Sequence, residues 1–133
     1  MSPTAGYSGK PLVDKLGIKP GMRVQIMGAP KDFELGPLPP GVRTGARKQL
    51  DLVMFFTTKK ATLARRWHTL TATVVPGGAV WVAWPKKASG VETDVTEDVV
   101  REVVLPTGWV DVKVCAVDDT WSGLKCVLRV ALR

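Results

Sequence analysis

Three short apolar runs stand out along the chain, at 22–28, 50–58 and 79–85. Their hydrophobic positions are continuous, which is typical of strands in a parallel sheet that is covered on both faces. Two later runs, 109–117 and 124–132, alternate between apolar and more polar positions. Such alternation is typical of an antiparallel hairpin with one buried face. The pattern therefore predicts three buried strands followed by a hairpin.

Helical periodicity fills the gaps between these strands. The stretch 59–74 carries apolar residues at the spacing of one helical face: Leu63, Trp67, Leu70 and Val74. A second helix is expected after 79–85, with Asp94 as its N-cap and Glu97 completing a capping box. A short helix at 11–17 opens the chain, between a proline suited to the first position and a glycine suited to the end.

This order of elements predicts one α/β domain over residues 1–133. Strands that alternate with helices imply a mainly parallel sheet with right-handed crossovers. We expect a Rossmann-like three-layer domain, with a mostly parallel sheet and a C-terminal antiparallel hairpin. The segment 29–49 is rich in proline and glycine, and we expect it to be irregular, with at most one weak strand near Val42. A length of 133 residues fits one such domain.

The hairpin pattern also sets an expected register. Matching its apolar faces pairs residues whose numbers sum to an even value, for example Val114 with Cys126. Cys115 and Cys126 then point to opposite faces, so no disulfide is expected between them. Two cysteines, a first segment (MSPTAGYSGKPL) without an apolar signal core, and the lack of a run of about 20 apolar residues together favour a cytoplasmic location without a membrane span.

The charge distribution and the few candidate catalytic residues exclude some functions but do not indicate one. The net charge is +7, but the basic residues are scattered, which favours solvated surface charge and leaves nucleic-acid binding as a weak alternative. His68 is the only histidine and lies on a polar part of the predicted helix, so it is interpreted as a surface residue. Without a Cys/His cluster, we expect no metal.

The stretch from 50 to 85 resembles the class I methyltransferase fold. In that family a Pro-Gly-Gly turn commonly precedes the fifth strand, as Pro76-Gly77-Gly78 precedes AVWVAWP here, and the fold ends in a hairpin with an antiparallel strand. The family also has several glycines after the first strand and an acidic residue at the end of the second. Here the corresponding stretches are MGAPKDF and VRTGARK. We therefore expect no S-adenosylmethionine, and no NAD, because a G-x-G-x-x-G loop is missing as well.

Nearly the whole chain also resembles an uncharacterised bacterial family, domain of unknown function 3052. The similarity is carried by AGYSGKPLVDKLGIKPGMRV, WVAWPKKASG, TDVTEDVVRE and VDVKVCAVDDTWSGLK. This resemblance implies no activity.

Topology indicates where a ligand would bind. Ligands of open α/β sheets lie outside the carboxyl ends of the parallel strands. The side chains expected at that rim are Lys86, Lys87, Asp94, Asp118, Asp119, Trp121 and Ser122. The alternative is that these residues form ordinary solvated turns. Our first hypothesis is a non-enzymatic binding or regulatory module on a degenerate methyltransferase-like scaffold, which recognises a small anionic ligand or a protein partner. The alternatives are an enzyme that uses Lys86 or Lys87 with Asp118, and a weak nucleic-acid binder; the oligomeric state stays open.

Overall fold

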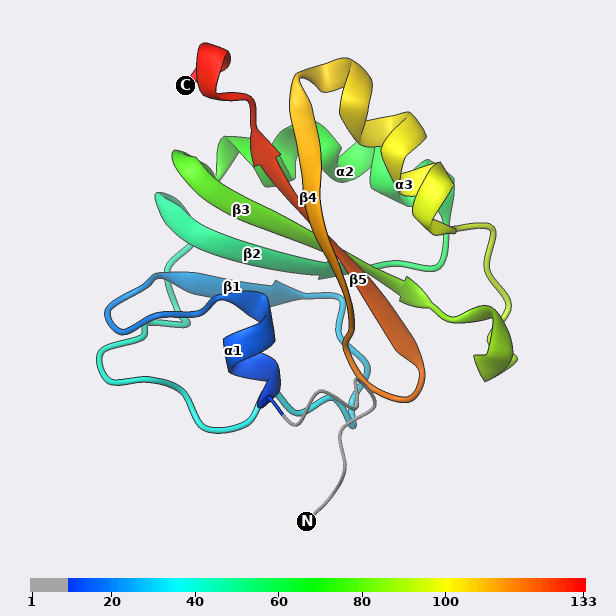
Figure 1. The fold of residues 1–133 in the computed structure, drawn as a ribbon, viewed down its shortest axis with the longest axis horizontal. Helices are drawn as coiled ribbons and strands as arrows, with labels where there is room; N and C mark the ends of the chain where they lie inside the picture. The colour runs from blue at the N-terminus through cyan, green and yellow to red at the C-terminus, as the bar shows by residue number, and fades with distance from the viewer. Residues whose placement is uncertain (1–9) are drawn as a thin grey trace.

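The computed structural model describes residues 10–133, and its centre is a five-stranded sheet (Figure 1). The strand order is β1-β2-β3-β5-β4. Strands β1 (Val24–Met27), β2 (Leu50–Phe56) and β3 (Val74–Pro85) are parallel. Strand β5 (Trp121–Leu128) lies antiparallel between β3 and β4 (Trp109–Ala116). The predicted mostly parallel sheet with a C-terminal antiparallel hairpin is confirmed.

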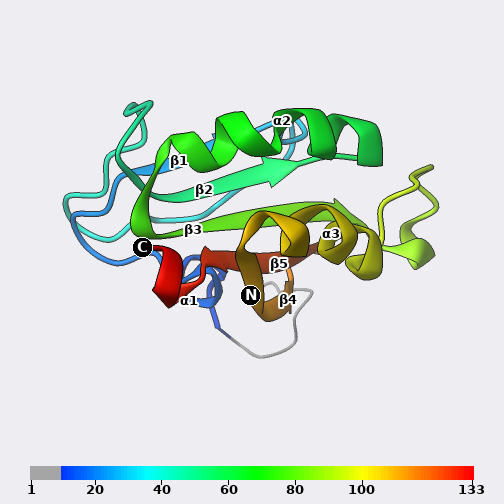
Figure 2. The same ribbon diagram turned by 90° about the horizontal axis from the view of Figure 1, so that it is seen from above.

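Helices cover both faces of the sheet, as the view from above shows (Figure 2). Helices α2 (Lys60–Ala72) and α3 (Glu97–Val104) lie on one face, and the short helix α1 (Leu12–Leu16) lies on the other. Short 3-10 turns follow at Lys87–Ser89, Leu105–Thr107 and Val130–Leu132. Within residues 10–133, no helix is long and apolar enough to cross a membrane.

The α2/α3 face is closed by large apolar side chains. Leu63 and Leu70 are almost fully buried at the positions that the helical periodicity predicted. Burying one such side chain contributes roughly 1.5–3 kcal/mol. Trp67 meets Trp109 edge to face, with ring centroids 5.8 Å apart, and donates its indole N–H to Thr107 Oγ1 over 3.0 Å. The C-terminal half of α2 is thereby fastened to the segment that leads into β4.

The α1 face is built around Trp81, which is fully buried on β3. Its indole N–H donates to the carbonyl of Leu16, at the end of α1, over 3.0 Å. On the neighbouring strand, Gly123 leaves room for the ring, since a Cβ there would lie 3.2 Å from Trp81 Cε3. Trp81 therefore joins helix α1 to the centre of the sheet.

The segment 29–49 forms no strand beyond a single parallel bridge between Arg23 and Arg43. Its residues Phe33, Leu35 and Val42 pack instead on the α1 face. Strand β1 therefore stands at the edge of the sheet. The strand predicted at 22–28 forms, but the expected burial was wrong for this reason, and Val24 is the only buried residue of β1.

The Pro-Gly-Gly motif lies inside β3 and does not end the preceding helix, which stops at Ala72. The register between β2 and β3 shifts here, because Leu50 pairs with Val74 and Leu52 pairs with Ala79. A Cβ on Gly78 would lie 2.9 Å from the carbonyl oxygen of Asp51. The glycine therefore lets the two backbones approach where the strand is irregular.

The hairpin forms as predicted, but its register differs in detail. Val114 pairs with Leu124, not with Cys126, and a bulge between Asp111 and Lys113 changes the parity of the pairing. Val112 and Val114, expected to be buried, are 54% and 50% exposed. Strand β4 is the other edge of the sheet, and α3 reaches it at Asp111, before these two valines.

The two cysteines lie on opposite faces of the sheet, as predicted, and both are free thiols. Cys126 belongs to the core under α2 and α3, whereas Cys115 packs on the α1 side. Burial raises the pKa of both thiols. Neither cysteine is therefore poised as a nucleophile.

Candidate functional site

The chain leaves β1 and β2 toward opposite faces of the sheet. After Met27 it passes to the α1 face, where Phe33 and Leu35 pack. After Phe56 it enters α2, on the other face. An opening between two adjacent parallel strands whose connections diverge in this way is the usual ligand site of an open α/β sheet. The carboxyl ends of β1 and β2 are therefore the first candidate site, and we call them the β1–β2 opening.

Gly28 shapes one wall of this opening. Its φ of +74° is a conformation that favours glycine, and a Cβ there would lie 2.7 Å from the carbonyl oxygen of Phe56. The residue is exposed, so it presents bare backbone at the end of β1. The glycine therefore lets the main chain that leaves β1 pass close to the end of β2.

An aromatic cluster lies beside the opening. The Phe33 and Phe56 rings meet edge to face with centroids 4.8 Å apart, and Phe56 meets Trp121 at 5.0 Å. The three rings come from the 29–49 segment, the end of β2 and the start of β5. The sequence did not indicate Phe33 or Phe56 as site residues. Phe33 lies in a segment without periodicity, and Phe56 belongs to a continuous apolar run that is typical of a core strand. Only the fold brings them to Trp121.

The structure brings together part of the predicted rim. The backbone N–H of Lys86 donates to the carbonyl of Thr120 over 2.7 Å. Asp118 Oδ1 accepts from the N–H groups of Thr120 and Trp121, at 2.9 and 2.8 Å. Lys86, Asp118 and Trp121 therefore share the carboxyl end of β3 and the tight turn beside it, as the topology predicted.

Three other residues of the predicted rim, Asp119, Lys87 and Ser122, lie near this turn but differ in exposure. Asp119 is exposed on the same turn, and Lys87 is exposed in the 3-10 turn that follows β3. Ser122 is half-buried and pairs with Trp84 within the β3–β5 ladder. Whether these side chains bind a ligand stays a prediction.

Asp94 lies apart from the turn that holds Asp118, and its predicted role as the cap of α3 was wrong. Its Oδ1 accepts from the backbone N–H of Lys60, the first residue of α2, over 2.7 Å. The N-cap of α3 is Thr96, whose Oγ1 accepts from Val99 N–H. Glu97 instead pairs with Arg101 one turn on. The local sequence could not show this, because the N–H that Asp94 accepts belongs to another helix.

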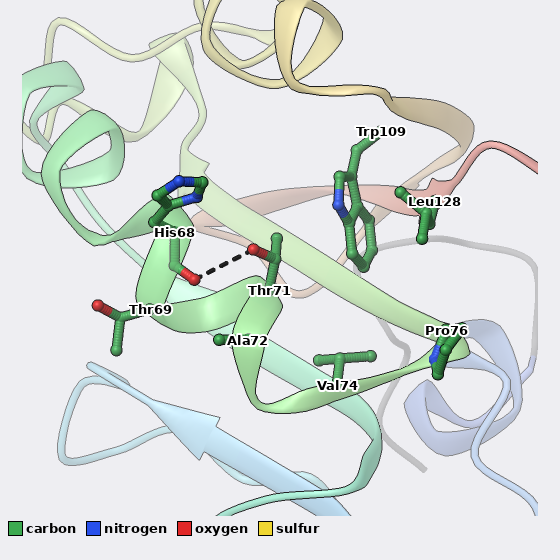
Figure 3. A pocket seen from close by; sticks show the side chains of 8 residues that line it. All are labelled: His68, Thr69, Thr71, Ala72, Val74, Pro76, Trp109 and Leu128. Atoms are coloured by element: carbon green, nitrogen blue, oxygen red, sulfur yellow. Dashed lines mark hydrogen bonds between the residues drawn. The ribbon is translucent and has the colours of Figure 1, made fainter. Parts of the chain in front are cut away.

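A hollow of about 660 Å³ opens at the opposite end of the sheet (Figure 3). It lies between the end of α2, the start of β3 and the hairpin, and the exposed His68 stands at its edge. Its floor is largely apolar and includes Val74, Pro76, Trp109 and Leu128. His68 is a surface residue, as predicted, and it has no acidic neighbour in this hollow.

Comparison with solved structures identifies the fold as that of S-adenosylmethionine-dependent methyltransferases. A SAM-dependent methyltransferase from Aquifex aeolicus superposes with a TM-score of 0.60 at 14% identity, over 86% of each chain. DhpI, in complex with SAH, gives 0.56 at 14% identity, over 82% of this chain and 76% of its own. Magnesium protoporphyrin IX methyltransferase from Synechocystis PCC 6803, with bound SAM, gives 0.54 at 8% identity, over 88% and 74%. At such identities the likeness establishes the fold alone.

Comparisons of sequence add no family. No family model matches the chain, and no curated protein matches it significantly. Membership in the uncharacterised bacterial family therefore stays a prediction.

The expectation that the chain uses no cofactor is corrected by these structural neighbours, which are SAM-dependent enzymes, two of them holding SAM or SAH. The expectation rested on the missing glycine loop after the first strand and on a missing acidic residue at the end of a second strand. In the structure, the stretch VRTGARK forms only the bridge at Arg43, so the strand itself is absent. The strand that would carry the carboxylate is therefore not part of this sheet.

Proposed function

We propose that this chain is a binding module of the methyltransferase fold that holds an adenosyl compound, S-adenosylmethionine or its demethylated product, at the β1–β2 opening. The observation that carries the proposal is the divergence of the chain after Met27 and after Phe56. It places the opening at the sheet position where such folds bind nucleotides and related cofactors. The SAM-dependent neighbours supply the class of ligand.

The residues around the opening fit an adenosyl group. Gly28 offers exposed backbone, and the half-buried rings of Phe33 and Trp121, which pack on the buried Phe56, offer aromatic surface of the kind on which a purine stacks. Asp32 and Glu34 flank Phe33 and are exposed, so their carboxylates are available to accept from ribose hydroxyls or an ammonium group. When bound, S-adenosylmethionine supplies an activated methyl group.

Binding is the proposed role, with catalysis by Lys86 and Asp118 as the disfavoured alternative. Asp118 already accepts two backbone N–H groups of its own turn, and Asp94 accepts one from α2. These carboxylates are engaged in holding the fold together, which leaves no free general base in the predicted set beyond the exposed Asp119. Lys86 and Lys87, which form no ion pair among residues 10–133, are suited to attract an anionic group of the ligand or of a protein partner.

Calorimetric titration with S-adenosylmethionine, S-adenosylhomocysteine and ATP tests the proposal. We expect saturable binding of the adenosyl compounds, weakened in the double variant Asp32→Asn/Glu34→Gln. Glu92→Gln, which alters an exposed carboxylate after β3, is the matched control and should bind like the wild type. At 100 times its dissociation constant, a ligand adds about 2.7 kcal/mol to the free energy of unfolding. A folded wild-type protein that binds none of the three compounds at millimolar concentration overturns the proposal.

A further inference from the structure

Four lysines gather on the α1 face, where helix α1 ends above β4 and β5; they are Lys15, Lys19, Lys113 and Lys125. Lys113 and Lys125 lie directly opposite each other in the β4–β5 ladder. Lys113 Nζ donates to the carbonyl of Lys15 over 3.0 Å, and Lys15 Nζ donates to the carbonyl of Ala116 over 2.8 Å. We call this group the lysine cluster.

Lys125 differs from Lys19 and Lys113, whose side chains are exposed, because its own side chain is partly buried. That side chain reaches the end of α1, where a Cβ added to Gly17 would lie 3.5 Å from Lys125 Nζ. Among residues 10–133 no oxygen accepts a hydrogen bond from this ammonium group, and no carboxylate pairs with it. Burial, together with the like charges of Lys113 and Lys19, lowers the pKa of Lys125.

No ion pair within residues 10–133 involves a lysine of the cluster. The ion pairs of these residues lie on the α2/α3 side, where Lys60 meets Glu102 and Arg101 meets three carboxylates. The first nine residues contain no Asp or Glu, so that segment cannot neutralise the cluster either. Like charges directly opposite on neighbouring strands are destabilising. The arrangement therefore costs stability unless an anion from solution balances it.

We propose that the lysine cluster binds a phosphate group, with the ammonium groups of Lys19, Lys113 and Lys125 as its donors. Ammonium groups are compact point charges with several donors each, and together they match the oxygens of a doubly charged phosphate better than a single carboxylate. Lys15 is only 6% exposed, and its ammonium is held by Ala116, so it adds charge without contacting the ligand. The site lies on the α1 face and does not depend on the β1–β2 opening.

Inorganic pyrophosphate is the probe, added to the full chain at constant ionic strength while thermal unfolding and binding heat are followed. We expect pyrophosphate to raise the melting temperature of the wild type. Lys125→Met should weaken pyrophosphate binding about tenfold or more, the value of one charge-assisted hydrogen bond. Without pyrophosphate, the same change should raise the melting temperature, because it removes a like-charge contact. Lys48→Met, which removes a charge at an exposed loop position, is the matched control. It should leave both the pyrophosphate affinity and the melting temperature close to those of the wild type.

Further variants and probes separate the outcomes. If Lys125→Met fails to fold, Lys113→Met, at an exposed position opposite it, serves in its place. Tighter binding of a short single-stranded oligonucleotide than of pyrophosphate, with the same dependence on Lys125, assigns the phosphate to a nucleic-acid backbone; the reverse order assigns it to a small molecule. Equal pyrophosphate binding by the wild type and Lys125→Met overturns the proposal. Titration with S-adenosylmethionine should give the same affinity in both proteins.

Discussion

Asp94 caps a helix to which it does not belong. Its carboxylate accepts the backbone N–H of Lys60 at the start of α2, 34 residues earlier, over 2.7 Å. The preceding residue makes a second contact between the same two loops: Thr93 Oγ1 donates to the carbonyl of Thr58 over 2.7 Å. The loop after β3 is thereby tied to the loop after β2, and these two contacts fix one side of the rim where ligands are expected.

Asp94→Ala should therefore destabilise the fold by about 1 kcal/mol, the usual value of a side-chain cap at a helix start. Urea unfolding followed by circular dichroism measures the change. Asp119→Ala is the matched control, since this exposed carboxylate lies on the turn after β4, and it should stay within about 0.5 kcal/mol of the wild type. Equal stability of the two variants would show that the Asp94 contact contributes nothing.

Trp81→Phe tests the joint between α1 and the sheet. The substitution leaves the carbonyl of Leu16 without the indole donor and opens a space in a fully buried position. We expect a loss of about 2–3 kcal/mol in the free energy of unfolding. Trp121→Phe, at a half-buried tryptophan on the rim, should lose clearly less. A reversed order of the two variants would contradict the central place of Trp81.

The Cys126 thiol should make the fold sensitive to alkali. Burial raises its pKa from an ordinary value of 9.0 to about 12, while the unfolded chain retains the ordinary value. Above pH 9 the unfolded state loses the proton first, so the native state binds more protons and stability falls as pH rises. This group contributes up to about 1.4 kcal/mol per pH unit.

The Cys126→Ala variant isolates that contribution. At neutral pH it should be less stable than the wild type, because it leaves a small cavity. The difference in urea midpoints should shrink between pH 9 and pH 10.5. A difference that is constant over this interval would show that Cys126 does not titrate differently in the two states.

Arg101 should set the acid titration of Asp111. Its guanidinium donates to Asp111 Oδ2 over 2.9 Å and lowers the pKa of that carboxyl below the ordinary value of 3.8. The stabilisation is therefore complete above that value and is lost as pH falls through the lower native pKa. In Arg101→Met, carboxyl chemical shifts should report a pKa of Asp111 nearer to the ordinary value. An unchanged titration would remove Arg101 as the cause.

The sequence predicted the elements whose pattern is strong and local. Leu63, Trp67 and Leu70 marked α2, and the alternating residues marked the hairpin, because burial on one face imposes those periods. It could not predict the aromatic cluster. Phe33 acquires its neighbours only when an irregular segment folds over the α1 face, and no period in 29–49 signals that path.

The sequence-based predictions were wrong where a residue interacts with a partner that is distant in the sequence. Asp94 lies where a helix cap is expected, but it serves the N–H of Lys60, and Thr96 takes the local role. The missing glycines and carboxylate after β1 were interpreted as the loss of a cofactor site. The carboxylate is missing together with the strand that would carry it, because the stretch around Arg43 forms only one bridge.

The bulge in β4 has a consequence for how concentrated solutions of this protein should behave. An exposed edge strand carrying Val112 and Val114 would ordinarily recruit the edge of another molecule and seed aggregation. The irregular pairing between Asp111 and Lys113 interrupts the row of backbone groups that an incoming strand would need. The ammonium group of Lys113 adds a charge that such a strand would have to bury. The same short stretch that exposes two valines thus keeps this edge from propagating into a fibril.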